Sequence, residues 1–238
     1  GHDPAHLQPA PDFIVRSPAV RRTEPEIEWA QAHDIPIIDR GRLLPAVLDH
    51  YRLVAVSGTH GKTTTSSMIA CILRASGVRT SWVIGGVCPV LGTVAHAEND
   101  GVVVVEADES DGTLQYYRPE IAVITTMDLD HVDYYRNEEQ LAGVYGAFAR
   151  SARTTVYPAS DPAAQRLLQG RDGAVSVSIG PGGSLCADIV SADARGTEFI
   201  LRDDRGRQAT FRLPVTGRHN VVNALCAVAA VEALGVSW

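Results

Sequence analysis

The sequence predicts an α/β protein built on a doubly wound, mostly parallel β-sheet. Continuous apolar runs, typical of strands that are buried on both faces, alternate with segments of helical periodicity. The clearest runs lie at residues 53–56, 102–105 and 121–124. Such alternation favours a parallel sheet that carries helices on both faces. In sheets of this kind, ligands bind beyond the carboxyl ends of the strands.

The first fifty residues are rich in proline and predict a short alternation of strands and helices. Residues 13–15 and 35–38 are the strand candidates, and residues 24–33 and 41–50 are the helix candidates. This stretch predicts the last part of a βαβ layer. It carries no obvious chemistry.

From Arg52 onward the pattern of strands and helices becomes clearer. Residues 63–76 place apolar side chains on one helical face, and Gly77 is a natural end for that helix. Residues 185–215 predict a small additional β region of two or three strands with a turn at 203–206. The remaining predicted elements are helices at 138–150, 162–169 and 219–234 and strands at 154–157 and 175–179.

Composition and charge exclude several classes of function. The 238-residue chain is 45% hydrophobic and 21% charged, which is ordinary for a soluble globular protein. A formal charge of −7 argues against binding to nucleic acid or to an anionic membrane. No apolar run approaches the ~20 residues of a membrane-spanning helix, and the N-terminus lacks signal-peptide features. The four widely spaced cysteines predict reduced thiols and a cytoplasmic location.

A glycine-rich loop, Gly58-Thr59-His60-Gly61-Lys62-Thr63, follows the first buried run. Gly58 and Gly61 let backbone N–H groups approach phosphate oxygens, and the following helix adds the partial positive charge of its N-terminus. Lys62 is the only lysine among 21 basic residues, which indicates a specific need for an ammonium group. We expect Lys62 to contact the β- and γ-phosphates of ATP, and the Thr63 hydroxyl to bind Mg²⁺.

Acidic clusters follow the other two buried runs. Parallel strands would bring these clusters and the glycine-rich loop to one edge of the sheet, where they predict a site for a magnesium nucleotide. Glu106 ends an apolar strand and is the predicted second anchor of the ion. The clusters comprise Glu106, Asp108, Glu109 and Asp111 after the second run, and Asp128, Asp130 and His131 after the third.

The chemistry of the residues leaves several roles open. Magnesium prefers oxygen ligands, so His131 is as readily a structural or exposed histidine as a ligand. His60 could face a substrate or simply fill an exposed loop. Asn220 and Asn223 open the last predicted helix, where asparagine is common without a binding role. Val56 replaces the first glycine of the usual Gly-x-x-x-x-Gly-Lys-Thr pattern, which disfavours an ordinary ATPase or GTPase.

Four motifs, in order, resemble those of the Mur ligases. They are Gly-Thr-His-Gly-Lys-Thr-Thr-Thr (58–65), Glu-Ala-Asp-Glu-Ser-Asp-Gly (106–112), Asp-Leu-Asp-His-Val-Asp-Tyr-Tyr (128–135) and Gly-Arg-His-Asn-Val-Val-Asn-Ala (217–224). The resemblance covers nearly the whole chain. It is strongest to the branch that joins L-alanine to UDP-N-acetylmuramate in peptidoglycan synthesis. It implies that ATP converts the substrate carboxylate to an acyl phosphate, which the amine then attacks.

The resemblance also implies roles for individual residues. Lys62 would stabilise the transferring phosphoryl group. Thr63 and Glu106 would hold one magnesium ion, and His131 with Glu106 would serve a second. The implied nucleotide contacts are Gly58, Thr59, His60, Gly61, Lys62, Thr63, Thr64, Asn220 and Asn223.

The resemblance implies a domain organisation as well. Residues 1–50 would be the remnant of a Rossmann-like N-terminal domain that binds the UDP substrate. Residues 51–238 would be the central ATP-binding domain. Members of the family are considerably longer, and their third domain, which completes the amino-acid site, has no counterpart in this sequence. We therefore expect that this chain alone does not complete the ligation.

Three alternatives stay open on the sequence. The relatives that attach a whole tripeptide to the same sugar nucleotide share the Gly-Thr-His-Gly-Lys-Thr loop, although residues 110–112 favour the alanine branch. A nucleotide-binding module without ligase activity is a second alternative. The intact residues Lys62, Thr63, Glu106 and His131 argue against it. A kinase or simple nucleotide hydrolase is the third, and the shortened loop disfavours it.

Overall fold

The computed structural model describes residues 1–17, 19–109, 112–128 and 137–238. The chain divides into two compact units, Gly1–Leu48 and Asp49–Trp238. Within the described residues, none of the helices combines the length and the apolar character needed to span a bilayer.

The first unit is a small βαβ arrangement. Strand β1 (Ile14–Arg16) pairs in parallel with β2 (Ile37–Asp39), and helix α1 (Pro25–Ala32) connects them. A 3₁₀ turn, η1 (Pro4–Leu7), precedes β1, and α2 (Arg40–Leu48) follows β2. The predicted strands and helices of this region are confirmed to within a few residues.

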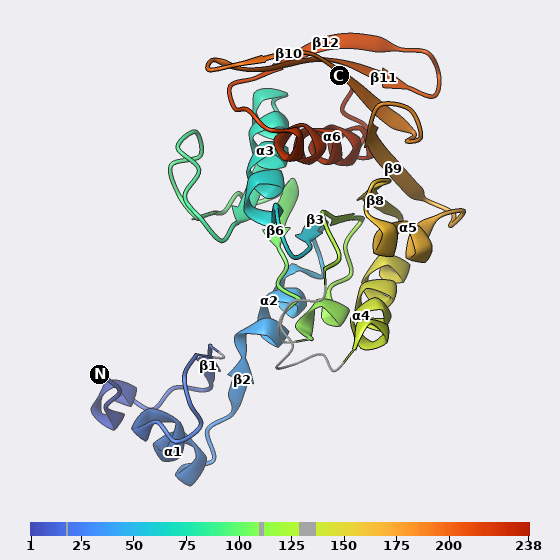
Figure 1. Ribbon diagram of the computed structural model, residues 1–238. Helices are drawn as coiled ribbons and strands as arrows, with labels where there is room; N and C mark the ends of the chain where they lie inside the picture. Colours follow the sequence, from blue (N-terminus) through green and yellow to red (C-terminus); the bar gives the residue numbers. More distant parts are fainter. Residues whose placement is uncertain (18, 110–111, 129–136) are drawn as a thin grey trace. The chain divides into compact units, whose positions relative to one another are not determined.

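The second unit contains a ten-stranded sheet in the order β12-β11-β10-β9-β8-β7-β3-β6-β4-β5 (Figure 1). All neighbours from β10 to β4 pair in parallel, whereas β5, β11 and β12 are antiparallel to their neighbours. The mostly parallel sheet predicted from the sequence is therefore confirmed. The strands are β3 (Arg52–Ser57), β4 (Thr80–Val83), β5 (Ala95–His96), β6 (Val102–Glu106), β7 (Ile121–Ile124), β8 (Thr154–Pro158), β9 (Ala174–Ile179), β10 (Leu185–Asp193), β11 (Gly196–Asp203) and β12 (Gln208–Leu213).

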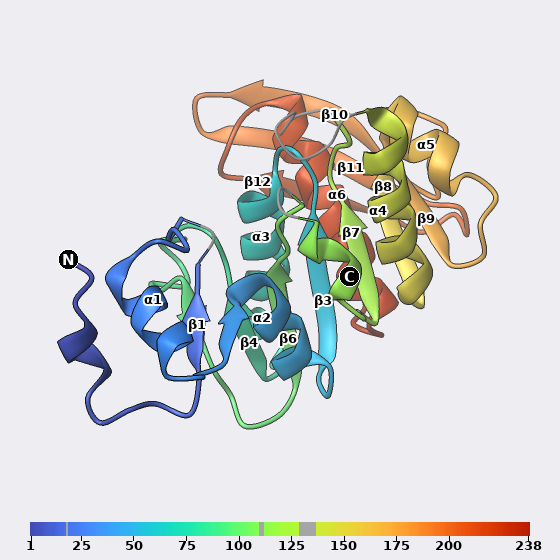
Figure 2. The same ribbon diagram turned by 90° about the horizontal axis from the view of Figure 1, so that it is seen from below.

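Helices cover both faces of this sheet. The β3–α3–β4 connection runs toward one edge, whereas the β7–α4–β8 and β8–α5–β9 connections run toward the other. Because such crossovers are right-handed, α3 lies on one face and α4 and α5 lie on the opposite face (Figure 2). Helix α6 packs beside α3 and against β8 and β9 (Figure 1). The helices are α3 (Lys62–Ala75), α4 (Glu138–Ser151), α5 (Pro162–Leu168) and α6 (Arg218–Ala233), with a 3₁₀ turn η2 (Thr113–Tyr116) before β7.

This topology locates the place where a ligand can bind. The connections change direction between the neighbouring strands β3 and β7, so the segments that follow these two strands lead to opposite faces. In doubly wound sheets, ligands bind beyond the carboxyl ends of the strands at such a switch point, so this is where we expect a ligand.

The central strands owe their position to burial on both faces. Val54 and Val56 of β3 pack in the core with Ile69 and Leu225 from the helices α3 and α6. The alternate residue Leu53 is equally buried. This two-sided burial explains why the strands appear in the sequence as unbroken apolar runs.

The sequence interpretation did not include β4 and β5. The β4 segment Thr-Ser-Trp-Val is half polar, so it forms no apolar run. Thr80 and Ser81 can nevertheless be buried because their hydroxyls are hydrogen-bonded. Thr80 Oγ1 donates to the Val78 carbonyl at 2.8 Å, and Ser81 Oγ accepts from Glu98 N at 2.9 Å. The additional β region continues the main sheet, because β10 pairs with β9.

Candidate functional site

The glycine-rich loop joins β3 to α3 in a conformation that requires its two glycines. Gly58 has φ +135° and Gly61 has φ +84°. A Cβ atom at Gly58 would lie 2.8 Å from the backbone nitrogen of Thr126, and one at Gly61 would lie 2.6 Å from Asn223 Oδ1. Both positions therefore need positive φ and the absence of a side chain. The loop packs closely against the segment after β7 and against α6.

The segment after β7 holds the first half of the loop. Thr59 N donates to the Thr126 carbonyl at 3.2 Å, and His60 N donates to Thr126 Oγ1 at 2.9 Å. Thr59 Oγ1 bonds to the backbone of Asp128. The backbone N–H groups of Thr59 and His60 thus already have partners inside the protein. The donors that face outward for a phosphate are those of the first turn of α3, since the first N–H groups of a helix have no intrahelical acceptor.

Lys62 begins α3 and reaches back over the loop. Its Nζ donates to the Gly58 carbonyl at 2.7 Å and lies 3.0 and 3.1 Å from the two carboxylate oxygens of Glu109. The Glu109 side chain is 2% exposed and that of Lys62 is 16% exposed. Ser57 Oγ also donates to Glu109, at 3.3 Å. The buried carboxylate of Glu109 therefore holds the Lys62 ammonium against the glycine-rich loop.

Thr63 and Glu106 meet beside this pair. Strand pairing places Glu106 opposite Val56, one residue before the end of β3. The Thr63 hydroxyl donates to Glu106 Oε2 at 2.9 Å, and Gly85 N donates to the same oxygen at 2.8 Å. A hydroxyl and a carboxylate are oxygen ligands of the kind that Mg²⁺ prefers, so these two residues fit the ion. Among the described residues, no group of three His, Cys, Asp or Glu side chains is arranged to hold a metal, either here or in the rest of the fold.

The start of α6 also reaches the loop. Asn223 is 8% exposed, and its side-chain oxygen lies against Gly61. Asn220 lies one turn earlier and donates from Nδ2 to the Thr216 carbonyl at 2.7 Å. Thr64 is half-buried in the first turn of α3, and the His60 side chain is exposed. His131 and its neighbour Asp130 lie outside the described residues, as does Asp111.

The sequence interpretation placed Glu109 in an acidic cluster but not among the site residues. Its four acids lie within six positions, the first at the end of β6 and the others after it, and their spacing alone does not show which side chain turns inward. Glu109 turns inward to Lys62, whereas Asp108 is exposed. The sequence does not show which of these acids is buried and paired with Lys62; only the structure does.

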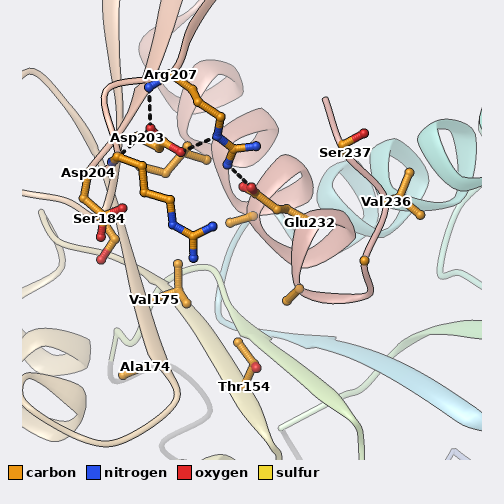
Figure 3. A pocket seen from close by; sticks show the side chains of 15 residues that line it. Thr154, Ala174, Val175, Ser184, Asp203, Asp204, Arg207, Glu232, Val236 and Ser237 are labelled. Atoms are coloured by element: carbon orange, nitrogen blue, oxygen red, sulfur yellow. Dashed lines mark hydrogen bonds and ion pairs between the residues drawn. The ribbon is translucent and has the colours of Figure 1, made fainter.

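A separate cavity of about 590 Å³ lies near the first residues of β8 and β9 (Figure 3). Thr154 and Ala174, which begin these strands, line it. Arg207 crosses it between Asp203 and Glu232. Because parallel strands place their amino ends opposite their carboxyl ends, this cavity is not part of the loop site.

Comparison with known proteins agrees with the geometry. The profile of the Mur ligase middle domain matches residues 56–231. The UDP-N-acetylmuramate–L-alanine ligase of Thermobifida fusca (strain YX) is 38% identical over 241 residues, which is 99% of this chain and 51% of the relative. The enzyme of the same name from Gloeobacter violaceus is 36% identical, over 100% of this chain and 51% of the relative.

Solved structures show the same fold. The crystal structure of UDP-N-acetylmuramate-alanine ligase from Thermotoga maritima superposes with a TM-score of 0.89 at 28% identity, over 99% of this chain and 54% of that chain. The UDP-N-acetylmuramate:L-alanyl-gamma-D-glutamyl-meso-diaminopimelate ligase of Neisseria meningitides gives 0.85 at 28%, over 100% of this chain and 79% of that chain. The chain spans about half the length of the curated relatives it matches. It belongs to the Mur ligase family.

Proposed function

We propose that this chain is the ATP-binding part of a ligase that joins L-alanine to the carboxylate of UDP-N-acetylmuramate. One observation carries the proposal: at the start of α3, Thr63 meets Glu106 at the end of β6, and Lys62 meets Glu109 just beyond it. This arrangement offers an ammonium and helix N–H groups to phosphates, and oxygen ligands to magnesium. The names of the relatives supply the two substrates.

The residues would act in two chemical steps. In the first, a substrate carboxylate oxygen bonds to the γ-phosphorus of ATP and the bond to ADP breaks; Lys62 balances the charge that builds on the moving phosphoryl group. In the second, the neutral amine of alanine attacks the acyl carbon, the nitrogen gives up a proton to solvent, and the bond between the acyl carbon and the phosphate oxygen breaks as phosphate leaves. Magnesium, held by Thr63 and Glu106, would neutralise phosphate charge.

Other residues would complete the site. His131, together with Glu106, would serve a second magnesium ion, as the family resemblance implies. Asn220 and Asn223 would contact the nucleotide from α6, and the close approach of Asn223 to Gly61 supports this assignment. Residues 1–50 would belong to the region that binds the UDP substrate. The proposed use of ATP and a UDP-sugar is consistent with a cytoplasmic location.

A second candidate is the ligase that attaches a tripeptide to the same sugar nucleotide. The observation in its favour is the structural likeness to the Neisseria ligase, whose name describes a peptide substrate. The two candidates share the first chemical step and differ only in the amine that ends the reaction.

The test is phosphate release by the natural protein that contains this sequence. Reactions would hold Mg-ATP and UDP-N-acetylmuramate with either L-alanine or the tripeptide. We expect release that requires L-alanine and falls at least about a thousandfold in Lys62→Ala, because an ammonium that stabilises the transferring phosphoryl group would be lost. Release that requires the tripeptide would favour the second candidate, and release without either amine would contradict both.

A further inference from the structure

We propose that Glu109 is a positioning residue for Lys62. Its buried carboxylate holds the ammonium over the glycine-rich loop, where it serves the phosphoryl group in transfer rather than the nucleotide at rest. This inference rests on the proposed function, because it assigns a task within that reaction.

The geometry shows how tightly the ammonium is held. Both carboxylate oxygens of Glu109 lie within 3.1 Å of Lys62 Nζ, and the Gly58 carbonyl accepts from the same nitrogen at 2.7 Å. Glu109 itself is 1% exposed as a residue and accepts a further hydrogen bond from Ser57. A carboxylate buried to this extent is very unfavourable unless it is paired. The burial and the hydrogen bonds of Glu109 indicate that its ion pair with Lys62 is a defined structural feature of the loop.

Charge makes the position of Glu109 informative. A bound nucleotide brings several negative charges to the same ammonium, and a carboxylate within hydrogen-bonding distance of that ammonium repels them. If the loop were selected only to bind ATP tightly, an anion here would be a disadvantage. Glu106 already provides the carboxylate that contacts Thr63, so Glu109 is not needed for that contact.

The advantage of the pair lies in the reaction. A free ammonium would move onto the phosphates of bound ATP and stabilise the ground state, which raises the barrier to transfer. Held by Glu109, it stays where charge develops as the phosphoryl group leaves ADP. The pair therefore weakens the binding of the nucleotide and raises the rate of phosphoryl transfer.

The test compares Glu109→Gln with Glu120→Gln. Glutamine keeps the size of Glu109 and an oxygen acceptor for Lys62 but removes the charge. Both variants are made in the natural protein that contains this sequence. We expect kcat to fall at least about tenfold in Glu109→Gln, while the Kd for Mg-ADP stays equal or decreases. Glu120 lies just before β7, at the amino ends of the strands and therefore away from the loop, where it pairs with Arg52 and Arg153. Its variant loses the same charge and should leave kcat and Kd unchanged.

A second readout does not depend on activity. Lys62 is the only lysine of the 238-residue chain, so lysine labelled with ¹³C at Cε gives a single side-chain NMR signal from this chain. We expect Glu109→Gln to shift this signal in the nucleotide-free protein and Glu120→Gln to leave it in place. Addition of Mg-ADP should then move the signal further in Glu109→Gln than in the wild type.

The outcomes separate the inference from the proposed function. If the wild type neither binds Mg-ADP nor releases phosphate, the proposed function fails. If the wild type is active and Glu109→Gln keeps its kcat, or loses kcat and affinity in the same proportion, the inference alone is overturned. Should Glu109→Gln not fold, Glu109→Asp decides: its shorter reach should lower kcat without tightening Mg-ADP, and a wild-type kcat would contradict the inference.

Discussion

Single residues decide how closely the glycine-rich loop can pack. Gly61 combines φ +84° with a neighbour, Asn223 Oδ1, that lies 2.6 Å from the place of a Cβ atom. We expect Gly61→Ala to lower the free energy of unfolding by about 2–3 kcal/mol, because backbone strain and a clash add together. Urea denaturation measures this loss, and Mg-ADP titration should show weaker binding in the same variant.

Gly77 provides the matched control for this substitution. It also has positive φ, +77°, but no atom lies within 4 Å of its Cβ position. Gly77→Ala should therefore show the backbone strain alone, about 1 kcal/mol. Equal losses in the two variants would show that the contact with Asn223 contributes nothing.

At the same scale, the sequence predicts some of the contacts between side chains and not others. That Thr63 and Glu106 meet near Lys62 could be predicted, because each stands at a fixed place relative to a strand end and parallel pairing brings those ends together. The roles of these residues stay a prediction. Glu109 could not be assigned, since it lies in an irregular segment three residues beyond β6. Only the folded chain shows that its side chain turns toward Lys62.

Among the elements, α5 is joined to β7 through one side chain. Asp161 caps α5 by accepting from Ala163 N and Ala164 N through Oδ1, and its Oδ2 accepts from Met127 N beyond β7 at 2.8 Å. We expect Asp161→Ala to lower the free energy of unfolding by about 1–2 kcal/mol. Asp161→Asn keeps the cap but loses the Met127 bond, so about half of that loss should remain in urea denaturation. A full loss in Asp161→Asn would contradict this division.

The strands β3, β7 and β8 are joined at their beginnings by an ion-pair network. Hydrogen bonding to Arg52 lowers the pKa of Glu120, and the charge of Arg153 adds to this. The folded pKa therefore lies below the unfolded one, so the stabilisation is complete above about pH 4.5 and is lost as the pH falls through the folded pKa.

Glu120→Gln tests this network by urea denaturation across pH. At pH 7 the variant should be less stable than the wild type by about 1 kcal/mol or less, since both arginines are exposed. The difference should shrink toward zero between pH 4.5 and pH 2. A difference that stays constant over this range would show that the charge of Glu120 is not its source.

Whole helices and strands could be predicted where the buried residues follow a simple pattern along the sequence. The runs of β3, β6 and β7 are apolar because helices cover both faces of the sheet, and α3 and α4 show the periodicity of one buried face. Strand β4 has no such signal, because hydrogen bonds allow its two hydroxyl side chains to be buried. Its place in the sheet depends on pairing with β6, a long-range contact that local pattern does not encode.

For the molecule as a whole, the two compact units differ in what they contain. The main hydrophobic core consists entirely of residues after 53, and the loop, Glu106, Glu109 and Asn223 all lie in the second unit. Among the described residues of the first unit, few apolar side chains are buried, namely Ile27, Ala30, Pro45 and Leu48. A core of that size does not offset the conformational entropy of 48 residues. The second unit therefore has the means to fold alone, and the first does not.

We accordingly expect residues 49–238, made without the first unit, to unfold cooperatively in urea and to bind Mg-ADP with the Kd of the whole chain within about threefold. Residues 1–48 made alone should show no cooperative transition. The result also tests the interpretation that residues 51–238 are the ATP-binding domain, since every proposed nucleotide contact lies in them. Loss of Mg-ADP binding in a shortened chain that still folds would contradict that interpretation and would assign residues 1–48 a part in holding the nucleotide.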